Sequence, residues 1–106
     1  MMKPRMTVAI LSVMALSAIT LFAQGSGANT YKAKCVMCHA ADGSGATPAG
    51  KATKTPSFKS PEVAKRSTAE LIAATKNGKG KMPAYSGRLT GAQITEVVAY
   101  IRTLQK

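Results

Sequence analysis

The only two cysteines and the only histidine of this 106-residue chain fall within five consecutive positions, Cys35-Val36-Met37-Cys38-His39. On a helical turn, positions i, i+3 and i+4 share a face, so Cys35, Cys38 and His39 project to the same side. A chain of this length forms a single small domain. Its fold must therefore be built around one site that holds these three side chains.

The C-x-x-C-H spacing is typical of covalent attachment of a c-type haem, in which two thiols bond to one porphyrin and the adjacent imidazole reaches its iron. Three alternatives explain the motif less well. A structural zinc site needs four ligands, and the chain has only three Cys or His residues. A thiol redox pair would belong to a βαβ pattern, which the sequence lacks. A disulfide across two residues closes too short a loop to constrain the chain. The motif predicts one covalent haem c, with Cys35 and Cys38 as thioether links and His39 as an iron ligand.

The N-terminal quarter has the pattern of an export signal. Lys3 and Arg5 provide positive charge, an uncharged stretch covers residues 6–22, and small residues follow. We predict a signal peptide at residues 1–23, with the cut uncertain within 23–28. An uncleaved membrane anchor is the alternative, because the apolar stretch approaches the length that spans a bilayer.

The remaining chain, residues 24–106, is predicted to be one monohaem domain outside the cytosol. The short charged region before the apolar stretch, without a long transit sequence, favours a bacterial periplasm over a thylakoid lumen. Membrane insertion is not expected once the signal is cleaved.

The sequence of this domain predicts helices joined by loops. A short helix is expected at Asn29–Cys38, followed by a 21-residue loop at Ala40–Ser60 that is rich in Gly and Pro. Helix starts are indicated at Ser60-Pro61-Glu62 and by a capping box at Ser67–Glu70, with a stop at Asn77-Gly78. A second loop is expected from Lys76 to Tyr85.

The C-terminal helix has the clearest pattern. A capping box at Thr90–Gln93 precedes apolar residues that recur on one helical face: Ile94, Val97, Val98, Ile101 and Leu104. No segment alternates as a half-buried strand would, so the fold class is all-α. A 21-residue loop is unusual in so small a domain, and a bound apolar cofactor would organise it.

The second axial ligand of the iron decides whether the iron is open to substrates. No second His exists, so Met is the natural candidate, as in cytochromes with Met/His ligation. Met37 lies between the attachment cysteines, and the other four methionines precede residue 15, which leaves Met82. Pro83 restricts Met82 to an extended conformation. The alternatives are that Met82 merely fills an apolar gap, or that Lys79 or Lys81 replaces it at high pH.

At this point the chain resembles a class I cytochrome c, most closely the small bacterial or cytochrome c6-like members. The resemblance covers the whole domain and rests on CVMCH, the ADGSG run at 41–45, the KMPAY segment at 81–85 and the amphipathic C-terminal helix. It implies a cytochrome c fold, in which small helices and long loops wrap one covalent haem.

The resemblance also implies specific contacts. The first and last helices should cross with Gly27 and Tyr31 against Val97 and Tyr100. The carbonyl of Pro48 is the candidate acceptor for the Nδ1–H of His39. The Trp that binds a haem propionate in several family members is missing here, and Lys54 or Arg88 are the candidate replacements.

An iron with both axial positions filled by protein exchanges electrons without making bonds, so we expect a soluble periplasmic electron carrier of a respiratory chain and not an enzyme. The chain has 15 Lys or Arg against 4 Asp or Glu, which suits redox donors and acceptors with acidic docking surfaces. Nucleic acid is not an expected partner, because only 5% of residues are aromatic and Trp is absent. The protein is expected to be a monomer. The alternatives are a fixed haem subunit of a larger oxidoreductase, or an open-site haem protein with peroxidase or gas-sensing activity.

Overall fold

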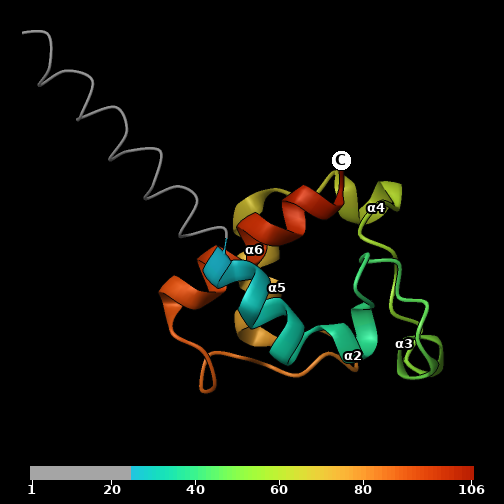
Figure 1. Ribbon diagram of the computed structural model, residues 1–106, viewed down its shortest axis with the longest axis horizontal. Helices are drawn as coiled ribbons and strands as arrows, with labels where there is room; N and C mark the ends of the chain where they lie inside the picture. The colour runs from blue at the N-terminus through green and yellow to red at the C-terminus, as the bar shows by residue number, and fades with distance from the viewer. Residues whose placement is uncertain (1–24) are drawn as a thin grey trace, which may run out of the picture.

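The computed structural model describes residues 25–106, and the predicted signal peptide at residues 1–23 lies outside them. The first helix occupies residues 25–34 of this part and is called the N-terminal helix below. The helices that follow are α2 Val36–His39, α3 Pro48–Ala52, α4 Pro61–Ala64, α5 Thr68–Asn77 and α6 Gly91–Leu104 (Figure 1). Within the described residues the only β feature is one isolated bridge, between Lys79 and Met82. The all-α prediction is confirmed.

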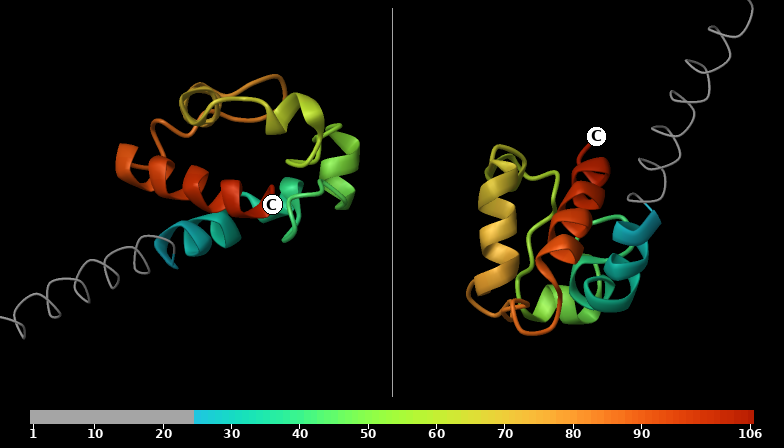
Figure 2. Two further views of the ribbon diagram at one scale, coloured as in Figure 1. Left: turned by 90° about the horizontal axis from the view of Figure 1, so that it is seen from above. Right: turned by 90° about the vertical axis from the view of Figure 1, so that its left-hand side faces the viewer.

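The N-terminal helix lies across α6, far away in the sequence (Figure 2). Gly27 permits this crossing, because a Cβ at this position would collide with the backbone carbonyl of Glu96. Tyr31 is almost fully buried, and its ring centroid lies 5.2 Å from that of Tyr100. Val97 is fully buried in the same core cluster. The crossing expected from the family resemblance is therefore present.

Both predicted capping boxes form. The Ser67 hydroxyl accepts the N–H of Glu70 at 3.1 Å, and the Glu70 carboxylate accepts the N–H of Ser67 at 3.0 Å. Thr90 and Gln93 pair in the same way at the start of α6. Because Gly78 adopts a positive φ of 76°, α5 ends at the predicted position. α6 buries the predicted face, including Ile94, Val98 and Ile101.

The segment predicted as a loop at residues 40–60 contains a helix, α3, and the loop prediction was wrong there. Thr47 caps this helix by accepting the N–H of Gly50 at 2.9 Å, and Pro48 occupies its first turn. This is a short-range start signal of the same kind as the one at Ser60-Pro61. The first helix also differs from the predicted range of Asn29–Cys38. It is already present at residue 25 and breaks at Cys35, before α2 begins.

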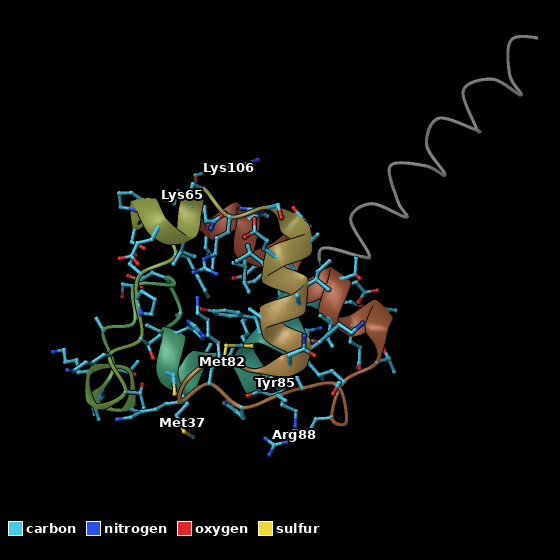
Figure 3. The ribbon with its side chains drawn as sticks, turned by 180° about the vertical axis from the view of Figure 1, so that it is seen from behind. Met37, Lys65, Met82, Tyr85, Arg88 and Lys106 are labelled. Carbon is cyan, nitrogen blue, oxygen red and sulfur yellow. The ribbon has the colours of Figure 1, made fainter. Side chains whose placement is uncertain are left out.

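The elements follow one another around a common centre, with α6 between the N-terminal helix and α5 (Figure 2). The segment between α5 and α6, residues 78–90, closes this arrangement below α5 (Figure 3). No helix among residues 25–106 is both long and apolar enough to cross a membrane.

Candidate functional site

The CVMCH turn forms where the N-terminal helix ends and α2 begins. The N–H groups of Cys38 and His39 both donate to the carbonyl of Cys35, at 3.3 and 3.0 Å, so the motif closes into a single helical turn. Cys35, Cys38 and His39 are half-buried. Met37 is 78% exposed and points out of the molecule (Figure 3). The three predicted side chains are therefore partly covered by the protein, whereas Met37 is not.

The chain leaves this turn through Ala40 in an unusual conformation. Its φ of 67° and ψ of 163° belong to a region that is essentially reserved for glycine. Its carbonyl accepts a 2.6 Å hydrogen bond from the hydroxyl of Tyr31. The carbonyl of His39 accepts the N–H of Gly45 at 2.9 Å. The exit from the motif is therefore fixed by two hydrogen bonds, and Ala40 bears backbone strain.

Burial shifts the pKa values of two groups in the motif, His39 and Cys35. It lowers the pKa of His39, so the imidazole is neutral at neutral pH, the form that binds a metal. It raises the pKa of the Cys35 thiol to about 11. Redox-active thiols usually have lowered pKa values, so the raised value is unfavourable for a thiol redox pair. Both cysteines are free.

The predicted hydrogen bond between His39 and Pro48 does not form. The Nδ1 atom of His39 is buried and has no hydrogen-bond partner. Pro48 is an exposed residue in the first turn of α3, where helix geometry directs its carbonyl along the helix towards the following turn. Instead of Pro48, it is Thr47 that joins this segment to the motif, because its hydroxyl donates to the carbonyl of Met37 at 2.6 Å.

Phe58 is the neighbour of His39 that the sequence did not reveal. Its ring is stacked on the imidazole, with centroids 4.6 Å apart and planes at 16°. Phe58 is buried in the core cluster with Tyr31 and Val97. The one available signal was that Phe58 is the sole Phe after residue 22.

Met82 lies in a loop that is fixed at both ends. Lys79 and Met82 exchange backbone hydrogen bonds of 3.1 and 3.0 Å. The N–H of Tyr85 donates to the carbonyl of Thr75 in α5 at 3.0 Å, and its hydroxyl donates to the carbonyl of Lys34 at 3.2 Å. Met82 is half-buried, with its thioether between α2 and α5 on the inner side of the loop (Figure 3). The loop therefore presents Met82 to the interior that the CVMCH turn also faces.

The donor groups gathered here are two free thiols, one neutral imidazole and one thioether. In residues 25–106, no three His, Cys, Asp or Glu side chains come together closely enough to hold a metal ion by themselves. The set instead fits a haem, which needs two thiols for its attachment and nitrogen and sulfur ligands for its iron.

Residues 23–101 match the family described as cytochrome c oxidase, cbb3-type, subunit III. Similar proteins include a cytochrome c6 of a Synechococcus species, 32% identical over 87% of this chain and 88% of that protein. A cytochrome c6 of Leptolyngbya boryana is 35% identical over 72% of this chain and 86% of that protein. A cytochrome c6 of a Nostoc species is 37% identical over 72% of this chain and 66% of that protein. The chain belongs to the class I cytochrome c family. As a cytochrome c, it binds one covalent haem c and transfers electrons between redox proteins, and it is not an enzyme.

Proposed function

We propose that this cytochrome c is a soluble periplasmic carrier of single electrons, with its haem attached through Cys35 and Cys38 and its iron bound by His39 and Met82. The observation that carries the proposal is the placement of these four residues. The CVMCH turn and the loop at residues 78–90 are far apart in the sequence, and each is closed by backbone hydrogen bonds. The proposal is supported by the partial burial of all four side chains and by the position of Met82 on the inner side of its loop (Figure 3).

Two protein ligands to the iron, His39 and Met82, would explain why the protein transfers electrons and does not catalyse a reaction. When bound, the haem supplies an iron that alternates between two oxidation states. His39 and Met82 would both bind the iron, which would leave no ligand position open for a substrate. A thioether ligand favours the reduced iron and therefore raises the reduction potential.

The surface charge supports docking to acidic redox partners. Lys76, Lys79, Lys81 and Arg88, on either side of Met82, are all exposed. Lys51, Lys54 and Lys59 are exposed in the segment that contains α3. Such positive surfaces increase the rate of encounter with negatively charged partners. We propose that the protein acts as a monomer in these encounters, which size-exclusion chromatography tests.

Covalent attachment is tested by haem staining after denaturing electrophoresis. The double variant Cys35→Ala/Cys38→Ala should lose the stain, because no thioether can form. Met37→Leu is the matched control within the same turn and should keep it. A stained band from the double variant would disprove the attachment sites.

Export is tested by fractionating the native host cell and sequencing the N-terminus of the purified protein. Recovery from the periplasm with an N-terminal residue from 24 to 29 supports signal cleavage. Recovery from the cytosol, or from membranes with residues 1–23 still present, would contradict the proposal.

A second candidate is a fixed haem subunit of a larger respiratory oxidoreductase. It is favoured by the match to a family named for subunit III of an oxidase. The two candidates differ in partner and not in the haem site. Stable co-purification with membrane-bound subunits would favour the fixed subunit, whereas purification as a single chain would favour the free carrier.

A further inference from the structure

Tyr85 connects the loop that carries Met82 to the helix that leads into the CVMCH turn. Its hydroxyl donates to the carbonyl of Lys34 at 3.2 Å, although the two residues are 51 positions apart in the sequence. Lys34 directly precedes Cys35, and Tyr85 follows Met82 by three positions. One side-chain hydrogen bond therefore links the two segments that carry the proposed haem-binding residues.

The break of the helix at Cys35 makes the Lys34 carbonyl available for this bond. In an uninterrupted helix the carbonyl would accept the N–H of the residue four positions later, Cys38. In this structure the N–H of Cys38 donates to the carbonyl of Cys35 instead, at 3.3 Å. Carbonyls at a helix end take a side chain or water as their partner, and here the Tyr85 hydroxyl is that partner.

The rest of Tyr85 is fixed on the α5 side of the molecule. Its N–H donates to the carbonyl of Thr75 in α5 at 3.0 Å, and its carbonyl accepts the N–H groups of Arg88 and Leu89, both at 2.9 Å. The guanidinium of Arg88 lies 5.7 Å from the centre of its ring, and Tyr85 lies at one end of α5 (Figure 3). The loop itself begins at the end of α5, so the hydroxyl is the part of Tyr85 that reaches across to the N-terminal helix.

Met82 is coupled to Tyr85 through a short and stiff segment. The backbones of Lys79 and Met82 exchange two hydrogen bonds, so this turn moves as a unit. Two residues separate Met82 from Tyr85, and the ring of the first, Pro83, prevents free rotation about its N–Cα bond. An outward movement of Met82 therefore strains the contacts of Tyr85.

We propose that Tyr85 is a positioning residue for Met82: its hydroxyl ties the Met82 loop to the N-terminal helix and opposes displacement of Met82 from the iron by external ligands. The inference rests on the proposed function, which assigns Met82 to the iron. A ligand that binds only after Met82 has moved away has an apparent dissociation constant that is inversely proportional to the fraction of open molecules. Loss of a hydrogen bond that exists only in the closed loop raises this fraction and lowers the apparent constant.

The test is a titration of the oxidised, haem-loaded protein with imidazole, followed by the loss of the Met–iron absorption band. Tyr85→Phe removes the hydroxyl and keeps the ring against Arg88, so the fold should be retained. We expect its apparent dissociation constant for imidazole to fall about two- to tenfold, as the net strength of one hydrogen bond implies. Tyr100→Phe removes a hydroxyl from a half-buried tyrosine of α6 and should leave the constant unchanged.

A second control separates the tie from general stability. Ser67→Ala removes the N-cap of α5, and it should lower the thermal midpoint while the affinity for imidazole stays the same. An unchanged dissociation constant in Tyr85→Phe would overturn the inference. An equal fall in Ser67→Ala would overturn it as well, because any loss of stability would then open the loop. The proposed function fails separately, if the unaltered oxidised protein has no Met–iron band before imidazole is added.

Discussion

Ala40 shows how the CVMCH turn constrains a single residue. The chain must turn sharply after His39, since the loop at residues 41–45 returns to bond with the His39 carbonyl. Ala40 makes this turn with a φ of 67°, and its carbonyl is held by Tyr31. A non-glycine residue in this conformation stores about 1–3 kcal/mol of strain.

Ala40→Gly should therefore stabilise the protein by about 1 kcal/mol, because the relief of strain exceeds the ~0.4–1 kcal/mol lost through greater freedom of the unfolded chain. Urea unfolding of the haem-loaded protein at neutral pH measures the change. Ala46→Gly is the control: Ala46 is exposed in the same loop and has no positive φ, so this substitution should destabilise slightly. A loss of stability in Ala40→Gly would contradict the strain assigned to Ala40.

Single residues also show which parts of the site the sequence could predict. The helical turn that joins Cys35, Cys38 and His39 was predictable because it is local. Met82 was selected by elimination among few methionines, and its binding to the iron stays a prediction. The surroundings of the His39 ring were not predictable. Pro48 has the sequence spacing of a hydrogen-bond acceptor, but it lies in the first turn of α3 and its carbonyl is directed along that helix. Phe58 contacts the ring only through long-range packing.

At the scale of elements, the starts of α4, α5 and α6 were predicted, whereas α3 and the break at Cys35 were missed. The starts of α4, α5 and α6 each have a side chain or proline in a recognised capping position within four residues. Thr47-Pro48 before α3 is a signal of the same kind, but it lies among glycines that favour a loop. The break at Cys35 has no such local signal, and the turn that follows it is held by long-range contacts with Thr47 and Tyr31.

The capping box of α5 makes helix stability depend on pH. Hydrogen bonds from Ser67 lower the pKa of Glu70. A carboxyl group whose folded pKa is lowered stabilises the fold above its unfolded pKa of about 4.3, and this contribution is lost as the pH falls through the folded value. We therefore expect Glu70→Gln to lower the thermal midpoint at pH 6–7 and to have little effect near pH 3.

Thermal unfolding of the two proteins between pH 3 and pH 7 measures the difference. Glu96→Gln removes the same charge from the middle of α6 and serves as the control for a general charge effect. Ser67→Ala should destabilise the protein by about 1 kcal/mol, because the N-cap acceptor is lost. A Glu70→Gln effect that does not shrink on acidification would show that the carboxylate charge contributes nothing to the cap.

At the scale of the whole molecule, the excess of positive charge is the property that determines the attraction to charged partners. Two of the 15 basic residues lie in the predicted signal peptide, so 13 remain in the domain against 4 acidic residues. Lys79 and Lys81 are on the Met82 loop, whereas Lys65 and Lys106 lie at the opposite end of the molecule (Figure 3). Electron transfer at the Met82 side should therefore respond to the first pair more than to the second.

Oxidation of the reduced protein by ferricyanide, a small anion, tests this placement. The rate should fall as ionic strength rises, because the attraction between opposite charges is screened. Lys79→Gln/Lys81→Gln should slow the reaction at low salt by about twofold or more. Lys65→Gln/Lys106→Gln removes the same net charge and should slow it less. Equal effects of the two double variants would mean that total charge, and not its position near Met82, controls the rate.

The optical spectrum of the purified protein, oxidised and reduced, before and after addition of carbon monoxide, tests the His39/Met82 assignment most directly. The account predicts a covalent low-spin haem, a Met–iron absorption band in the oxidised form and no change with carbon monoxide. It also predicts that Met82→Ala loses the band and gains carbon monoxide binding, while Met37→Leu behaves as the unaltered protein does. A high-spin haem, or carbon monoxide binding by the unaltered protein, would contradict the account and place the function in catalysis or gas sensing.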